Sequence, residues 1–256
     1  MSIDLNFTGA RQRGSVTRRE FIVTRDGSPV PGVLWGSEST EPGAPLVLYG
    51  HGASGDRHQA PIPRIADALA RKGIFGLAID GPVHGLRKVG DGGRGAFGEV
   101  MRSESMVDDI LADWGAALGA IRGLPEVGEG KLGYFGLSMG TILGTPVVAS
   151  FATSVAVLGL MGTISPTERY GEQLKTAASR IHCPVLFIMQ LEDELFPRDR
   201  CLDLFDRIAS DDKRLHANPG LHPEVPVEEI DFATDFLARH LLGAEASRGA
   251  TGSIAE

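Results

Sequence analysis

One serine of the chain stands in a pattern that could make its hydroxyl a nucleophile. Residues 136–140 are Gly-Leu-Ser-Met-Gly, a G-x-S-x-G motif centred on Ser138. Residues 131–135 before it have the composition of a strand, and the residues from 141 onward that of a buried helix. A serine at such a sharp strand-to-helix turn needs small neighbours, because a Cβ at the flanking glycines would not fit. The context predicts Ser138 as a nucleophile at the carboxyl edge of a sheet, beside the positive end of a helix dipole.

A serine hydroxyl becomes a good nucleophile only when a base takes its proton and an acid orients that base. Four histidines follow the serine: His182, His216, His222 and His240. We favour His222, because it follows an Asn-Pro-Gly turn just past the last predicted strand, on the sheet edge of the serine. His216, within that strand, is the alternative base. His182 and His240 are expected to be solvated or to serve packing.

The acid should lie between serine and histidine along the chain. Residues 191–194, Leu-Glu-Asp-Glu, follow a buried apolar strand at the correct edge. We predict Asp193 as the acid, with Glu192 and Glu194 as substitutes if the loop turns differently. A solvated acidic loop is the competing interpretation. The chain order serine, acid, histidine favours the catalytic one, because one hydrolase architecture uses that order.

An ester carbonyl that is attacked develops a negative oxygen, which needs two preorganised main-chain donors. Met139 follows the nucleophile and is predicted to supply one N–H. The second is assigned to Ala53, in the glycine-rich loop 49–55 after an early strand. His51 in the same loop is interpreted as structural, hydrogen-bonding the loop rather than acting as a base.

Five motifs in order carry a resemblance to a known family. Residues 46–55 (LVLYGHGASG), 80–85 (DGPVHG), 136–140 (GLSMG), 191–197 (LEDELFP) and 220–222 (GLH) together resemble the α/β-hydrolase superfamily, in its small dienelactone-hydrolase-like and prolyl-oligopeptidase-like esterases. The resemblance covers residues 21–242. It implies a mostly parallel eight-stranded sheet, Ser138 as nucleophile, Asp193 as acid, His222 as base, and no metal. Dienelactone hydrolases have a cysteine at the elbow, so their substrate is not implied; His84, in a D-x-x-x-H-G turn, is expected to be structural.

The elements that must position these residues follow from the hydrophobic pattern. Eight apolar runs predict strands at 21–24, 33–35, 46–49, 74–79, 132–135, 155–160, 185–189 and around Leu215. Several are apolar throughout, as in a parallel sheet covered on both faces. Helical periodicity predicts helices over 103–122, from Pro63, around 204–208 and over 230–241. We expect one α/β domain over 1–242 with an antiparallel edge and a minimal cap.

Two segments are predicted to be irregular. Residues 85–98 contain six glycines and few hydrophobic residues, and are expected to form a loop over one edge of the sheet. Residues 243–256 are small and polar and are expected to be a disordered tail.

Composition excludes several other roles. The 256 residues carry 25 Lys and Arg against 33 Asp and Glu, a net charge of −8, which disfavours nucleic acid as a partner. Cys183 and Cys201 form neither a disulfide framework nor a zinc pattern, and are expected to pack as small hydrophobic residues. The first residues lack a signal-peptide run, and the uncharged stretch 141–164 suits a buried helix leading into a strand better than a membrane span. We therefore predict a cytoplasmic protein without a membrane partner; the pattern gives no oligomeric state.

The pattern as a whole predicts a serine hydrolase that cleaves small to medium carboxylic esters through an acyl-enzyme. No cofactor is implied, because side chains alone generate the nucleophile. About twenty residues separate two of the predicted strands after residue 160, too few for a large lid. Phe97, Met161 and Phe196, with Met139, are predicted as apolar cleft walls. The alternatives are a thioesterase, peptidase or acyltransferase with the same triad, a lyase, or a non-catalytic ligand-binding member of the fold.

Overall fold

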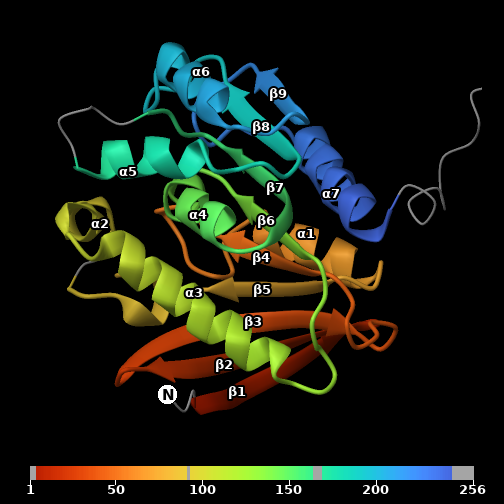
Figure 1. Cartoon of the computed structure of the whole chain (residues 1–256). Helices are drawn as coiled ribbons and strands as arrows, with labels where there is room; N and C mark the ends of the chain where they lie inside the picture. The colour runs from red at the N-terminus through yellow and green to blue at the C-terminus, as the bar shows by residue number, and fades with distance from the viewer. Residues whose placement is uncertain (1–3, 91–92, 164–168, 244–256) are drawn as a thin grey trace, which may run out of the picture.

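A mixed nine-stranded sheet organises the computed structural model, which describes residues 4–90, 93–163 and 169–243 (Figure 1). Its strand order is β1-β2-β3-β5-β4-β6-β7-β8-β9. Strands from β5 to β9 along this order pair in parallel, and β1, β2 and β3 form an antiparallel edge. The strands are β1 Asp4–Arg13, β2 Val16–Arg25, β3 Ser28–Ser37, β4 Leu46–Gly50, β5 Phe75–Ile79, β6 Leu132–Gly136, β7 Thr153–Gly159, β8 Val185–Gln190 and β9 Lys213–Asn218.

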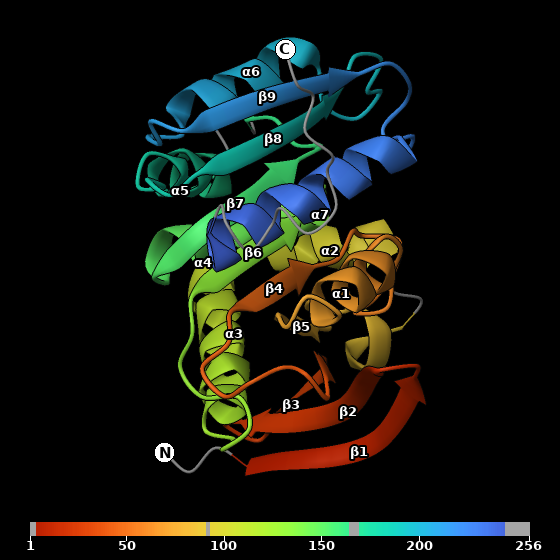
Figure 2. The same ribbon diagram turned by 90° about the vertical axis from the view of Figure 1, so that its right-hand side faces the viewer.

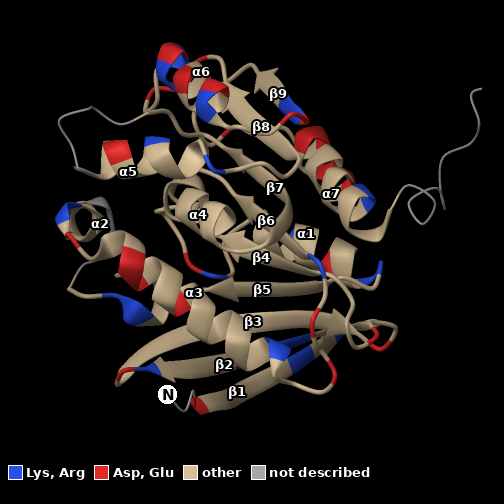
Figure 3. Ribbon diagram, viewed as in Figure 1, with Lys and Arg blue, Asp and Glu red and all other residues tan. Residues whose placement is uncertain are grey.

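Helices cover both faces of the parallel strands (Figures 1 and 2). They are α1 Ile62–Ala70, α2 Gly93–Arg102, α3 Met106–Arg122, α4 Met139–Ser150, α5 Arg169–Ala178, α6 Arg198–Arg207 and α7 Val227–Leu242, with a 3₁₀ turn η1 Gly85–Arg87. Within β4, Leu46 and Leu48 pack with α3 and α4 on one face, whereas Val47 and Tyr49 pack with α1 and α7 on the other. The strands β4 to β8 carry no charged residue, as expected for strands buried on both sides (Figure 3).

The predicted α/β fold and its mostly parallel sheet are confirmed, but the sheet has nine strands instead of eight. The strand that sequence analysis missed is β1, Asp4–Arg13, which pairs antiparallel with β2 along its whole length. Nearly all of its residues are exposed, so no buried face imposes an apolar alternation. Its side chains still contact β2, where the Arg19 guanidinium lies 4.5 Å from the centre of the Phe7 ring.

The prediction of an irregular loop over 85–98 is wrong, because η1 and α2 lie in this segment. Glycines weaken a helix by up to about 1 kcal/mol each, yet tertiary contacts override that preference. The Leu86 N–H donates to Asp80 Oδ2 at 2.8 Å, and Phe97 of α2 is buried against the core. Gly85 has a φ of +52°, and a Cβ there would collide with the Asp80 carboxylate, so the turn requires glycine.

Two other predictions concern the uncharged stretch and the C-terminal tail. The uncharged stretch 141–164 contains most of α4 and all of β7, and residue 164 lies outside the described residues. None of the described helices is both long enough and apolar enough to cross a membrane. The predicted tail 243–256 lies, from residue 244 onward, outside the described residues.

Candidate active site

Ser138 occupies a strained turn between β6 and α4. Its φ of +56° and ψ of −122° are uncommon for a residue with a side chain, and such values persist only where the surroundings enforce them. The Ser138 N–H donates to the Gly159 carbonyl at 2.9 Å, which ties the turn to β7. A Cβ at Gly140 would collide with the Gly50 carbonyl, and one at Gly136 with the Gly140 carbonyl. The small residues of the motif are therefore required by the close approach of three backbone segments.

His222 connects Ser138 to Asp193. Its Nε2 lies 2.9 Å from Ser138 Oγ, and its Nδ1 lies 2.8 Å from Asp193 Oδ2. A carboxylate only accepts, so Nδ1 carries the proton and Nε2 is left to accept from the serine hydroxyl. The Asp193 and His222 side chains are 2% and 11% exposed, so bulk water screens this pair weakly. The three residues come from loops after β6, β8 and β9, at the carboxyl ends of parallel strands.

The Asp193 carboxylate is fixed by main-chain donors as well as by the imidazole. Its Oδ1 accepts hydrogen bonds from the N–H groups of Leu195 and Phe196, at 2.8 and 2.9 Å. Glu192 and Glu194, the substitutes for the acid, contact the main chain of the histidine loop instead of the imidazole ring. Of the three carboxylates in this loop, Asp193 is therefore the one that faces the His222 side chain.

His216, the alternative base, and His240, expected to be solvated or to serve packing, contact groups other than Ser138. His216 on β9 pairs with Glu229 of α7 at 2.8 Å, and its ring packs on Phe232 with centroids 4.6 Å apart. The ring of His240 packs on Phe236 within α7. His216 therefore attaches α7 to β9, whereas the ring contact of His240 lies within α7.

His51 orients the peptide that carries the Ala53 N–H. Its Nε2 accepts from the Gly81 N–H at 2.8 Å, so the ring proton lies on Nδ1 and is donated to the Gly52 carbonyl at 2.8 Å. Burial lowers the pKa of His51, which keeps the ring in this neutral form. Because a trans peptide points its C=O and N–H in opposite directions, the bond to Gly52 sets the direction of the Ala53 N–H. The structural role predicted for His51 agrees with these contacts.

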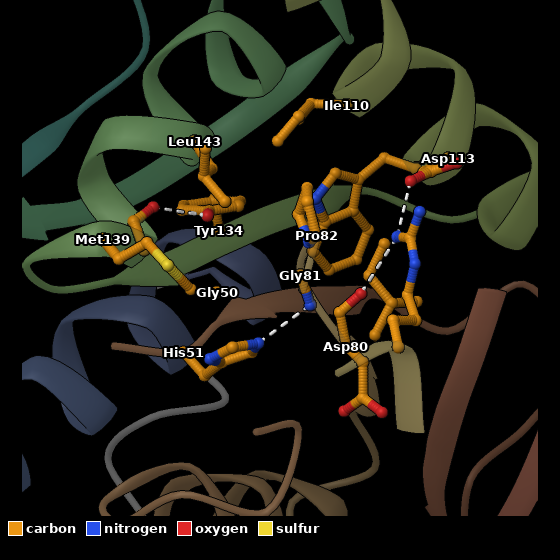
Figure 4. A pocket seen from close by; sticks show the side chains of 14 residues that line it. Gly50, His51, Asp80, Gly81, Pro82, Ile110, Asp113, Tyr134, Met139 and Leu143 are labelled. Carbon is orange, nitrogen blue, oxygen red and sulfur yellow. Dashed lines mark hydrogen bonds and ion pairs between the residues drawn. The ribbon is translucent and has the colours of Figure 1, made fainter. Parts of the chain in front are cut away.

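A small cavity of about 20 Å³ lies behind this loop, lined by residues that include Gly50, His51, Gly81 and Met139 (Figure 4). Figure 4 shows the His51–Gly81 hydrogen bond on one side, and on the other Tyr134 donating to the Gly140 carbonyl at 2.7 Å. Ser138 is not part of its lining. At roughly the size of one water molecule, the cavity is too small for an ester substrate.

Sequence analysis missed a buried charged group, Asp80, next to the loop that carries His51 and Ala53. Asp80 is fully buried and accepts from both the main-chain N–H and the guanidinium of Arg57, at 3.1 and 2.6 Å. His84 follows four residues later, with Nε2 3.1 Å from the Ala53 carbonyl and its ring against that of His51, centroids 5.3 Å apart. The motif at residues 80–85 includes Asp80 and could have pointed to it. Its partner Arg57 is distant in sequence and belongs to no motif, so the ion pair could not be predicted.

Ser138 opens into a cleft of about 750 Å³. Ala53, Met139, Phe97, Phe196 and His222 all contribute to its lining. Met161 does not belong to this lining; it is fully buried in the core on the α3 and α4 side of the sheet. The remaining lining residues are mostly apolar and include Ile62, Phe135, Leu137, Ile142, Leu160, Leu195, Pro223, Val225, Val227 and Ile230. Within the described part of the chain, no three His, Cys, Asp or Glu side chains are grouped to hold a metal ion.

Comparison with solved structures gives a relative over nearly the whole chain. A cold-adapted esterase from an Arctic intertidal metagenomic library is 36% identical, with a TM-score of 0.82, over 94% of this chain and 100% of that one. This chain is an esterase of the α/β-hydrolase superfamily. The sequence of this chain matches no family model and no curated protein.

More distant structures share the fold of the esterase. Acetyl xylan esterase 1 from Thermoanaerobacterium sp. is 19% identical with a TM-score of 0.71, over 93% of this chain and 88% of that one. A dienelactone hydrolase from Anabaena variabilis is 16% identical with a TM-score of 0.67, over 89% of this chain and 99% of that one. The 36% identical esterase confirms the resemblance that the sequence motifs indicated, at the level of the superfamily and of ester hydrolysis, and these distant structures share its fold.

Both cysteines of the esterase should be unreactive in the native state. Burial raises the pKa of the Cys183 thiol to about 11 and that of the Cys201 thiol to about 12. A thiol with a raised pKa stays protonated as pH rises toward that value, so at pH 8 roughly one Cys183 in a thousand is a thiolate. We expect iodoacetamide at pH 8 to leave both thiols and the ester turnover unchanged, and to alkylate both after denaturation, as measured by mass spectrometry. Rapid alkylation of the native protein with loss of activity would instead point to a catalytic thiol.

Proposed function

We propose that the esterase hydrolyses carboxylic esters through an acyl-enzyme on Ser138, with His222 as the base and Asp193 as the acid. The observation that carries this proposal is the pair of hydrogen bonds from His222 to Ser138 Oγ and to Asp193 Oδ2. The contacts fit these roles, with the serine hydroxyl donating to Nε2 and Nδ1 donating to the carboxylate. The conformation at Ser138 further supports the role, because strained elbow turns expose the nucleophile at the top of the sheet.

The reaction proceeds in two halves. Ser138 Oγ attacks the ester carbonyl carbon while its proton moves to His222 Nε2, and the carbonyl oxygen becomes an oxyanion. The carbonyl reforms as the C–O bond to the alcohol breaks, and the alcohol leaves with the proton from Nε2. Water then attacks the acyl-serine ester, passing a proton to Nε2, and the carboxylic acid is released as Ser138 Oγ regains that proton. Asp193 keeps its charge throughout and stabilises the imidazolium in both halves.

The oxyanion is assigned to the N–H groups of Ala53 and Met139. Met139 is the first residue of α4, so its N–H lies at the positive end of the helix dipole and is free of an intrahelical partner. The Ala53 N–H belongs to the peptide whose carbonyl is bound by His51. Donors that are fixed before the substrate binds need no reorganisation when negative charge develops, which makes them effective in catalysis.

The cleft favours an uncharged ester of small to medium size. Its walls are mainly aliphatic and aromatic, with Phe97 on α2 and Phe196 beside Asp193. Among the described residues of the lining, Arg64 alone has a permanent charge, and both oxygens of Asp231 already accept hydrogen bonds from its guanidinium. A charged acyl or alcohol group would therefore lose hydration against mostly apolar walls, facing one guanidinium that is already paired with a carboxylate.

A series of p-nitrophenyl esters tests this proposal. We expect kcat/KM to rise by up to about fourfold per added methylene, because each buried CH₂ contributes about 0.8 kcal/mol, until the chain fills the cleft and the value falls. With esters whose acyl-enzyme forms faster than it is hydrolysed, a burst of p-nitrophenol close to one per chain should precede steady turnover. Phe97→Ala should move the optimum to longer chains, whereas Phe232→Ala, outside the lining, should not. Absence of turnover and burst with every ester would refute the proposal.

The proposal also includes several expectations that come from the sequence alone. They are a single domain over 1–242, a cytoplasmic location, and activity without a cofactor, nucleic-acid partner or membrane partner.

A further inference from the structure

Three successive main-chain N–H groups of the histidine loop each donate to a different glutamate. The Gly220 N–H donates to Glu192 Oε2 at 2.5 Å and the Leu221 N–H to Glu224 Oε2 at 2.7 Å. The His222 N–H donates to Glu194 Oε2 at 2.9 Å. Glu192 and Glu194 flank Asp193, so the loop that orients the imidazole ring also binds the backbone that carries it.

The histidine loop is also held on its carbonyl side, where the buried Gln190 amide donates to the carbonyls of Pro219 and Glu224 at 3.2 and 2.9 Å. β8 and β9 pair as far as Gln190 and Asn218, and beyond them the loop turns through Gly220, which has a φ of +115°. Past the strand ends, main-chain bonds join Leu191 to the Asn218 carbonyl and Glu192 to the Gly220 carbonyl, at 2.8 and 3.2 Å. No such main-chain bond is recorded for the N–H of His222 within the described residues, so the contact to Glu194 fixes the loop at that point.

The carboxylates are not engaged elsewhere in the described structure. None of the recorded ion pairs involves Glu192, Glu194 or Glu224, and all three residues are exposed. Asp193 repels the Glu194 carboxylate and the His222 imidazolium attracts it, whereas the Arg198 guanidinium donates to the Leu191 carbonyl at 3.1 Å. The hydrogen bond from the His222 N–H lowers the pKa of the Glu194 carboxyl, so Glu194 remains a charged acceptor wherever the esterase is folded near neutral pH. Hydrogen bonds to a charged acceptor are roughly twice as strong as neutral ones.

We propose that Glu194, with Glu192, is a positioning residue that holds the His222 main chain and so aims Nε2 at Ser138. The inference rests on the proposed role of His222 as the base. The imidazole has few torsions of its own, so the position of the ring depends on its backbone as much as on Asp193. Because the ring accepts a proton and returns it in each half of the reaction, a small displacement weakens every step.

The test compares Glu194→Ala with Glu194→Gln. We expect Glu194→Ala to lower kcat by roughly tenfold or more with KM nearly unchanged, because Glu194 is not part of the cleft lining. Glu194→Gln keeps a carbonyl oxygen that accepts the His222 N–H and should restore most of kcat. Adding Glu192→Ala to Glu194→Ala should deepen the loss. Glu228→Ala, which removes an exposed carboxylate from the first turn of α7, is the control and should leave kcat unchanged.

A second measurement reports on the ring directly. The proton between His222 Nδ1 and Asp193 should give a far-downfield ¹H NMR signal, which His222→Ala removes and thereby assigns. We expect this signal to broaden or shift in Glu194→Ala and to be retained in Glu194→Gln and Glu228→Ala. Equal losses in the Ala and Gln variants, or a lower melting temperature with kcat and the signal unchanged, would overturn the inference. Full activity of His222→Ala would instead overturn the proposed base.

Discussion

Replacing Ser138 by alanine should lower ester turnover by about 10⁴- to 10⁶-fold while the protein stays folded, because the substitution removes the nucleophile alone. The Ser138 N–H keeps its bond to Gly159, and alanine has the same Cβ at the strained turn, so no new strain is introduced. The residual rate would come from the cleft and the main-chain donors. The measurements are steady-state hydrolysis of a p-nitrophenyl ester and thermal unfolding followed by circular dichroism.

Covalent labelling separates this interpretation from lyase or ligand-binding roles. A fluorophosphonate should modify the parent protein at one site per chain, on the tryptic peptide containing Ser138, and should not modify Ser138→Ala. Ser179→Ala, at an exposed serine beyond the end of α5, should keep both labelling and turnover. Stoichiometric labelling at another residue, or a Ser138→Ala variant with parental turnover, would exclude the acyl-enzyme on Ser138.

The central sheet could be predicted because burial leaves a strong mark on sequence. Strands β4, β6 and β8 lie between two layers of helices, so they consist almost entirely of apolar residues and glycine. The elbow was predictable for a related reason. Close contact of Gly136, Gly140 and Gly50 excludes side chains, and this exclusion leaves glycines at fixed spacing around Ser138.

The parts that sequence analysis missed depend on contacts rather than on local composition. Exposed β1 carries no hydrophobic pattern, and its position is set by pairing with β2. Helix α2 forms despite its glycines because Phe97 is buried in the core. Met161 and Phe196 look alike as apolar residues after strands, yet one lies in the core and the other lines the cleft. The direction of a side chain at a strand end depends on a few backbone angles that composition does not encode.

The contacts that hold the catalytic residues in place could not be predicted from the sequence either. Residues 192–194 are three adjacent carboxylates, of which one binds the imidazole and two bind main-chain N–H groups. Chain order and the preceding buried strand limited the acid to this run, and sequence analysis chose Asp193 but left Glu192 and Glu194 as substitutes. The geometry of the loop makes that distinction, and it leads to the second large effect expected of a single substitution.

Asp193→Asn should lower kcat by about 10⁴-fold, because the amide would reverse the hydrogen bond to the imidazole. Asp193 Oδ1 accepts from the N–H groups of Leu195 and Phe196, so the amide oxygen of asparagine should take that position. Its NH₂ group would then face His222 Nδ1, which could only accept. The ring proton would move to Nε2, and the atom that should take the Ser138 proton would already carry one. The measurement is kcat at saturating p-nitrophenyl ester, with thermal unfolding as a check on the fold.

Glu192→Gln is the matched control for Asp193→Asn, because it also replaces a carboxylate by an amide, one residue earlier in the chain. Glu192→Gln keeps an oxygen that accepts the Gly220 N–H and leaves the imidazole contact untouched, so kcat should fall by no more than a few-fold. Charge loss alone would make the two variants similar, whereas a reversed hydrogen bond damages only Asp193→Asn. A large loss in Glu192→Gln with a mild one in Asp193→Asn would move the acid to the neighbouring residue. That result would mean that the loop adopts a different turn in solution, with Glu192 reaching the ring.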